Sequence, residues 1–167
     1  MLMKINDQII YLRKAFPAFD GKVMYDVDRR GTEFCEMVMP NPSMPNMPLA
    51  VSLSESGCSL SVGQFDNVTG HDSMTVEQLC SAIRDVISDK IIFVMAYSEE
   101  DDVGFGKPFM TRIFAITGDN DDMSQEYDRF IAKISSPLGK FARRFTSLKG
   151  RFIITNYSGS INKIIIR

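Results

Sequence analysis

The sequence has few of the residues that usually hold metal ions or carry out nucleophilic catalysis. Its 167 residues include one histidine, His71, and three cysteines, none of which belongs to a CxxC pair. A protein zinc site usually takes three or four ligands, so a single histidine without a CxxC pair argues against a zinc site. No GxSxG segment accompanies the histidine, although a Ser-His-Asp hydrolase of the α/β type would carry one. We therefore expect no metal and no cofactor, and the sequence favours a protein that is not an enzyme.

Long apolar runs are missing as well. No stretch approaches the roughly 20 apolar residues that cross a bilayer, and the longest apolar run, at 91–97, has the length of a buried strand. The N-terminal residues carry neither a long apolar run nor a small-residue cleavage site, so we expect no export signal and a cytoplasmic location. Cys35, Cys58 and Cys80 each fall among apolar residues. This pattern predicts three buried free thiols, which fit a reducing compartment.

Acidic residues are missing from the last part of the chain. All 21 lie at or before Asp128, where 10 Lys and Arg leave a charge of −11, whereas residues 129–167 carry nine Lys and Arg and no acid. These opposite charges either neutralise one another within the fold or form two separate surface patches. We favour separate patches, because the acidic residues cluster in expected loops while the basic residues follow a helix face.

Apolar periodicity divides the chain into helices and hairpins. Helices are expected at 5–16, at 75–87, at 121–134 and at 138–148, and Thr75 and Gln78 have the spacing of a capping box. Strands are expected, mostly in hairpins, at 23–28, 33–40, 47–54, 58–62, 90–97, 109–117, 152–157 and 161–167. We expect the C-terminal hairpin, 152–167, to lie in the centre of the sheet. The order predicts a single α+β domain over residues 1–167, with a largely antiparallel sheet and three or four helices.

The segment 61–72 places the histidine close to two aspartates, Asp66 and Asp72. Carboxylates can orient an imidazole that titrates near neutrality, so acid–base or metal chemistry is one interpretation. The neighbouring Asn67 and Gly70 are common turn formers, however, and the expected helix starts just beyond them. We favour a structural loop, then a loop that contacts a partner, and last a catalytic or metal site.

Four other segments have a composition that resembles a binding motif. The segment 104–107, GFGK, lacks the spacing of a phosphate-binding P-loop and is followed by a proline. Acidic runs at 99–102, with Glu100 and Asp101, and at 119–122 lack the spacing of a calcium-binding EF-hand loop. The expected helix at 138–148 carries Arg143 and Arg144 opposite an apolar stripe. This pattern fits a helix packed on the core with solvated charges, and it also fits a helix that contacts a macromolecule or a membrane.

The layout of residues 60–97 resembles a known class of protein. A strand ends in a glycine-containing turn and leads through a loop with His71 to a capped amphipathic helix and then to DKIIFVMAY. In that order the run is similar to segments of small, acidic bacterial α+β proteins of the toxin-immunity type. The resemblance implies a protein that binds and blocks a cognate toxin and catalyses nothing.

The leading hypothesis is therefore a cytoplasmic, non-enzymatic protein-binding domain, and its more specific form is an immunity protein against a toxin. Its possible partner contacts are His71, Asp66, Asp72, Glu100, Asp101, Arg143 and Arg144. The alternatives are an enzyme whose site is assembled from dispersed residues, and a basic-helix module that contacts nucleic acid or a membrane surface. The acidic first 128 residues work against binding of nucleic acid.

Overall fold

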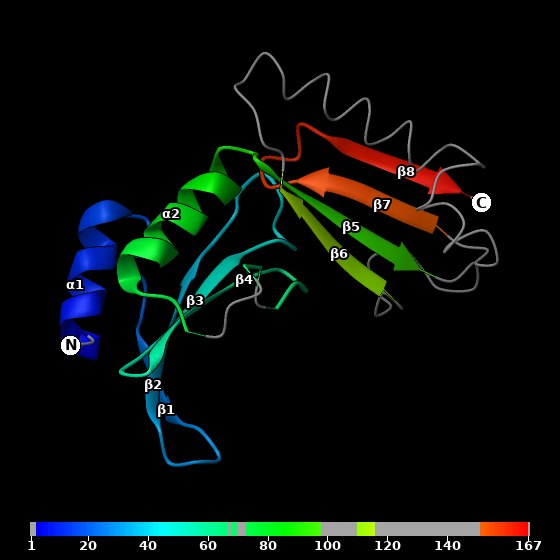
Figure 1. Cartoon of the computed structure of the whole chain (residues 1–167). Helices are drawn as coiled ribbons and strands as arrows, with labels where there is room; N and C mark the ends of the chain where they lie inside the picture. Colours follow the sequence, from blue (N-terminus) through cyan, green and yellow to red (C-terminus); the bar gives the residue numbers. More distant parts are fainter. Residues whose placement is uncertain (1–2, 67, 70–72, 98–109, 116–150, 167) are drawn as a thin grey trace. The chain divides into compact units, whose positions relative to one another are not determined.

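The chain folds into antiparallel sheets and helices, which confirms the α+β class (Figure 1). The computed structural model describes residues 3–66, 68–69, 73–97, 110–115 and 151–166. Its contacts divide into two compact units, Met1–Ile87 and Ser88–Arg167. The described strands form two four-stranded sheets instead of the one sheet expected from the sequence. The assignment of the whole chain to a single domain stays a prediction.

The first sheet joins two hairpins in chain order. Its strands are β1 (Met24–Val27), β2 (Glu33–Met39), β3 (Leu49–Ser54) and β4 (Gly57–Val62). The alternating sequence of β3 becomes an alternation of buried and half-buried side chains, because successive residues point to opposite faces. The register aligns the buried residues of three strands in rows across one face: Cys35, Leu53 and Cys58; Met37, Val51 and Leu60; Met39, Leu49 and Val62.

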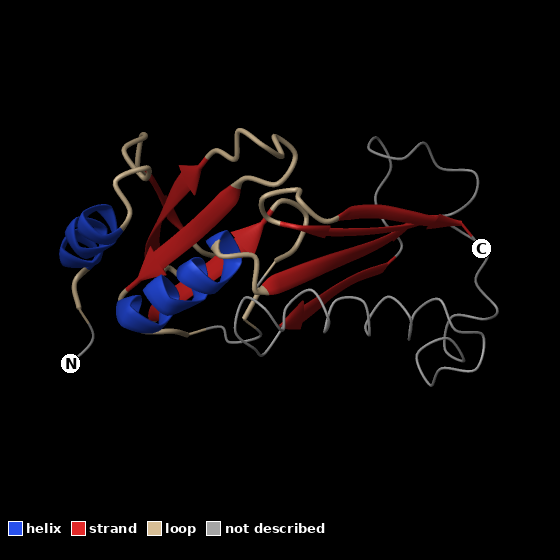
Figure 2. Cartoon of the chain, turned by 90° about the horizontal axis from the view of Figure 1, so that it is seen from above, coloured by secondary structure: helices blue, strands red, loops and turns tan. Residues whose placement is uncertain are grey.

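Two helices pack against this unit's core, as Figure 2 shows from above. Helix α1 (Ile5–Ala15) contacts β3, helix α2 (Val76–Ile87) contacts β4, and the helices contact each other. The buried Gln8 side chain connects α1 to the sheet: its Nε2 donates to the Ser54 carbonyl at 3.0 Å, and its Oε1 accepts from the Cys58 thiol at 3.4 Å. A buried amide with these partners fixes how α1 lies on the strands.

The start of α2 confirms the capping box expected from the sequence. The Thr75 N–H donates to Oε1 of Gln78 at 2.9 Å, and the Gln78 N–H donates to Oγ1 of Thr75 at 3.3 Å. Two backbone donors that the helix itself leaves unpaired are thereby satisfied. Met74, just before the cap, and Leu79 are both buried, as hydrophobic-staple residues are.

The second unit contains the other sheet, in the order β6-β5-β7-β8. Its strands are β5 (Ile91–Tyr97), β6 (Met110–Ala115), β7 (Arg151–Asn156) and β8 (Asn162–Ile166). The apolar run expected to be a central strand is β5, which pairs with β6 and β7. The C-terminal hairpin was expected in the centre of the sheet, and only one of its strands lies there. Strand β7 is inside the described sheet, whereas β8 is its edge strand, and Ile164 is 59% exposed.

Two side chains shape the turn between β7 and β8. The buried Asn156 donates through Nδ2 to Oγ of Ser160 at 2.8 Å and accepts the Ile161 N–H at 3.1 Å. Asp89, whose φ of 59° is in the left-handed region, accepts the Ser158 N–H at 2.9 Å. The Asn156 contacts lie within the hairpin turn, and the Asp89 contact connects the beginning of the second unit to that turn.

The helices expected at 121–134 and 138–148 lie outside the described residues, and the described part of the chain contains two helices. Neither of these two has the length and apolar character needed to cross a membrane.

Gly57 provides a test of the packing between the β3–β4 turn and the residues before α2. Its φ is 146°, and a Cβ atom there would lie 2.6 Å from Cα of Ser73. We expect Gly57→Ala to lower the free energy of unfolding by about 3 kcal/mol, because backbone must move. The control is Gly31→Ala, where φ is 81° but no atom lies within 4 Å. It should cost about 1 kcal/mol from backbone strain alone. Urea unfolding measures both, and equal losses would contradict the close contact.

Candidate functional site

The residues proposed from the sequence as partner contacts lie almost entirely outside the described part of the chain. Asp66 is described and exposed, directly after Phe65, which forms a bridge with Val62. The other six are not among the described residues: His71, Asp72, Glu100, Asp101, Arg143 and Arg144. The segment 104–107 lies outside them too. Their role as partner contacts therefore stays a prediction, and so does the separation of acidic and basic patches.

Strand β1 is an apolar strand without a buried residue. It is the outermost strand of its sheet in the part of the chain that the structure describes, and all four of its residues are exposed. Tyr25 is 64% exposed, Val27 is 55% exposed and Met24 is 48% exposed. Exposed apolar side chains along an open sheet edge are typical of sites where another strand adds to the sheet.

The backbone of β1 also faces outward at alternate residues. The Asp28 N–H donates to the Thr32 carbonyl at 3.0 Å, which closes the β1–β2 hairpin with a hydrogen-bonded pair. Since such pairs alternate along an antiparallel ladder, the N–H and C=O groups of Tyr25 and Val27 point away from β2. The Val27 N–H is taken by Oδ1 of Asp26 at 2.7 Å. The backbone of Tyr25 is therefore the part of this edge best placed to pair with another strand.

Carboxylates surround the apolar side chains of the β1–β2 hairpin. Met24 pairs with Glu36 and Val27 pairs with Glu33, and both glutamates are exposed, as is Asp26. The Asp28 carboxylate is used in the turn, where it accepts the N–H groups of Arg30 and Thr32, each at 2.8 Å. These backbone hydrogen bonds hold the pKa of Asp28 below its usual value. The two strands of the hairpin thus combine apolar contact area with carboxylates, whereas its arginines, Arg29 and Arg30, lie in the turn.

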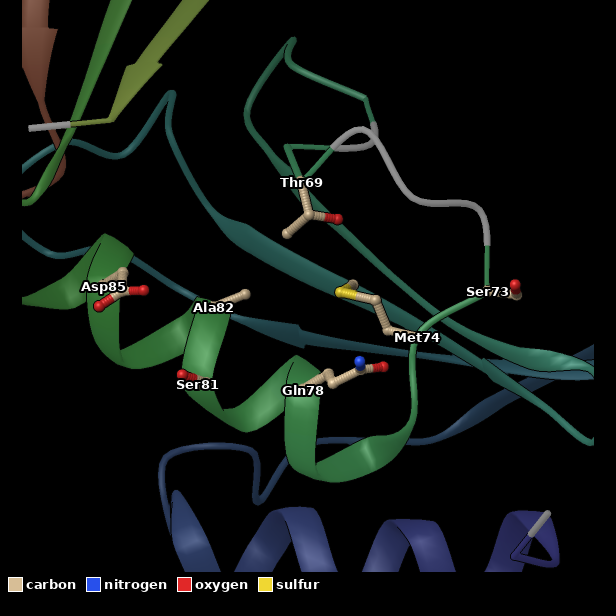
Figure 3. A pocket seen from close by; sticks show the side chains of 7 residues that line it. All are labelled: Thr69, Ser73, Met74, Gln78, Ser81, Ala82 and Asp85. Carbon is tan, nitrogen blue, oxygen red and sulfur yellow. The ribbon is translucent and has the colours of Figure 1, made fainter. Parts of the chain in front are cut away.

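A pocket of about 400 Å³ lies between α2 and the segment that precedes it (Figure 3). Gln78, Ala82 and Asp85 line it from successive turns of the helix, and Thr69 faces them from the loop side. The remaining lining residues are Ser73, Met74 and Ser81. Hydroxyl, amide and carboxylate groups give the pocket the capacity to hold a small ligand that donates hydrogen bonds.

The Thr69 hydroxyl has an unusual environment within this pocket. Its Oγ1 is the one buried side-chain oxygen or nitrogen, among the described residues, that has no hydrogen-bond partner. A buried hydroxyl without a partner costs folding free energy, because water would have satisfied it.

The three cysteines are buried free thiols, as the sequence predicts. Burial raises the pKa of Cys58 to about 12, and the nearby Cys80 and Cys35 add to the shift. Burial also raises the pKa values of Cys35 and Cys80. Since the thiolate is the reactive form, these residues are poor nucleophiles in the folded protein. No group of three or more His, Cys, Asp or Glu within the described ranges has an arrangement that could hold a metal ion.

Sequence reasoning did not single out β1 as a contact surface. The segment 23–28 has the composition of a strand, and its pattern does not say whether a helix covers it. Its acidic residues and its position in the first hairpin were the available signals. The sequence pattern does not reveal the pocket, because its lining residues come from a loop and from several turns of α2, between Thr69 and Asp85.

Thr69→Val tests the unpaired hydroxyl. The substitution replaces the oxygen by a methyl group of similar size, so we expect the free energy of unfolding to stay equal or rise by up to about 1 kcal/mol. Thr75→Val is the matched control: it removes the α2 cap and should cost about 1 kcal/mol. Thermal and urea unfolding measure both variants. A loss above about 1 kcal/mol in Thr69→Val would mean that the hydroxyl has a partner.

The raised pKa of Cys58 predicts a loss of stability at alkaline pH. The unfolded chain loses the thiol proton near the ordinary pKa of about 8.5, whereas the folded protein keeps it up to about 12. Stability from the buried neutral thiol is complete below about pH 8 and falls as pH rises, by up to about 1.4 kcal/mol per pH unit. Cys58→Ala should be less stable near neutrality but show a shallower alkaline decline in urea unfolding. Parallel pH profiles would contradict the shift.

Comparisons with protein-family models, curated proteins and solved structures find no match to this chain. Among the described residues, the first unit provides two candidate features for a function. They are the exposed edge at β1 and the pocket beside α2.

Proposed function

We propose that this chain is a cytoplasmic, non-enzymatic protein-binding protein, and that it acts as an immunity protein that binds and blocks a toxin. The observation that carries the binding role is the exposure of Met24, Tyr25 and Val27 on β1, which is the outermost strand of the first sheet among the residues that the structure describes. Exposed apolar surface at an unpaired edge promotes aggregation, so its presence favours a site that a partner covers.

The immunity role has a different support, which is the layout of residues 60–97. A protein of that type needs a surface that recognises its target, and it needs no catalytic residues. We propose a protein partner and no nucleic-acid partner, because the acidic first 128 residues would repel phosphates. The proposal keeps one α+β domain for the whole chain, with further helices at 121–134 and 138–148.

The β1 surface can be tested by capture of a partner from native lysate. The bait is the tagged full chain, compared with the double variant Tyr25→Lys/Val27→Lys and with Ile10→Lys as matched control. Ile10 is an exposed apolar residue of α1, 66% accessible. A specific partner should be retained by the wild type and the control, and reduced by about tenfold or more with the double variant. Equal capture by all three baits would overturn the role of β1.

The immunity role needs a functional readout. We expect expression of the captured partner to inhibit growth, and co-expression of the wild-type chain to relieve that inhibition, whereas the double variant does not. A toxin gene immediately upstream would support the same conclusion, and a metabolic operon would oppose it. Catalytic turnover that is lost in His71→Ala, with the fold intact by circular dichroism, would overturn the non-enzymatic role.

A further inference from the structure

We propose that β1 binds its partner by strand addition, and that the added strand is an extended segment in which apolar and basic residues alternate. The inference rests on the proposed protein-binding function and specifies the chemistry of the segment that is recognised. Three features of the β1–β2 hairpin carry it: the direction of its backbone groups, the two faces of β1, and the carboxylates beside them.

The backbone of Tyr25 provides the pairing site. Both its N–H and its C=O point away from β2, so one residue of an incoming antiparallel strand can exchange two hydrogen bonds with it. The neighbouring outward N–H, that of Val27, is occupied by the Asp26 carboxylate at 2.7 Å. This occupation limits indiscriminate pairing along the edge, because a longer ladder must first displace the Asp26 side chain.

The side chains of β1 specify an alternating pattern in the added strand. Tyr25 and Val27 lie on one face of the sheet, and Met24 and Asp26 lie on the other, because successive residues of a strand alternate. Glu36, opposite Met24, adds a second carboxylate to the face of Asp26. A neighbouring strand therefore gains most from apolar residues beside Tyr25 and Val27, and from Lys or Arg beside Asp26.

The same carboxylates argue against a second copy of the chain as the occupant. Two β1 strands that paired antiparallel across a two-fold axis would place the Asp26 carboxylates of the two copies on the same face of neighbouring strands. Like charges across neighbouring strands are destabilising. A basic segment of another protein fits the edge without this penalty.

The test uses the full chain and three labelled peptides, with fluorescence anisotropy as the measurement. The first peptide alternates valine and lysine, the second alternates valine and glutamate, and the third is the valine–lysine peptide with a central proline. The valine–lysine peptide should bind, and the other two should bind about tenfold more weakly or worse. Equal binding of the lysine and glutamate peptides, or no loss with proline, would overturn the inference.

Tyr25→Pro tests the backbone site on the protein side. Proline removes an N–H that points outward, so the hydrogen bonds between β1 and β2 are kept while the outer edge is blocked. Binding of the valine–lysine peptide should be lost in this variant and unchanged in Ile10→Lys. If Tyr25→Pro does not fold, the peptide comparison on the wild-type chain still decides the question.

Two results separate this inference from the proposed function. If the partner captured from lysate depends on Tyr25 and Val27 but peptide binding ignores charge or proline, the partner uses β1 in another way and the strand-addition inference fails alone. If sedimentation shows a dimer of the wild-type chain that Tyr25→Pro abolishes, a second copy occupies the edge, and the basic-segment inference is overturned.

Discussion

The first unit depends on the burial of one face of three strands beneath two helices. The rows formed by β2, β3 and β4 are almost completely apolar, so this face must be covered if the sheet is to be stable in water. Gln8 fixes the position of α1 by hydrogen bonds to Ser54 and Cys58, and the Thr75–Gln78 cap fixes where α2 begins. The apolar register and these few polar contacts together determine where the cover lies.

The exposure of β1 is a consequence of where that burial stops. Tyr25 pairs with the buried Cys35, so it lies on the same face as the core residues, yet it is itself largely exposed. Its hydroxyl donates one long, exposed hydrogen bond, of 3.5 Å, to Oδ1 of Asn6 at the beginning of α1. The face that the helices cover therefore ends between β2 and β1. Strand β1 therefore adds little to the buried core. Its exposed apolar side chains are better explained by binding than by stability.

Local patterns in the sequence were enough to predict most of the described elements. The alternation around Leu53 and Leu60, the cap at Thr75 and the continuous apolar run of β5 each reflect short-range physics, and each is confirmed. The division into two sheets was not predicted, because no change in composition marks the boundary after Ile87. The edge position of β8 was missed because its isoleucines resemble those of a buried strand. Sheet order and exposure depend on contacts between distant residues, which periodicity does not record.

The boundary between the units also bears on how the toxin-immunity resemblance should be understood. The run that carries it begins in β4, passes through α2 and ends in β5, so it crosses from the first compact unit into the second. The edge at β1 belongs to the first unit alone. Residues 1–87 carry eleven acidic and seven basic residues, a net charge of −4 that includes the carboxylates beside β1. An acidic surface accelerates the approach of a basic partner at long range, and this effect weakens with salt. At contact, the carboxylates of Asp26 and Glu36 favour positively charged side chains on the partner, and Tyr25 and Val27 provide apolar contact area. Long-range attraction and short-range pairing therefore favour one kind of partner, a protein with a basic extended segment.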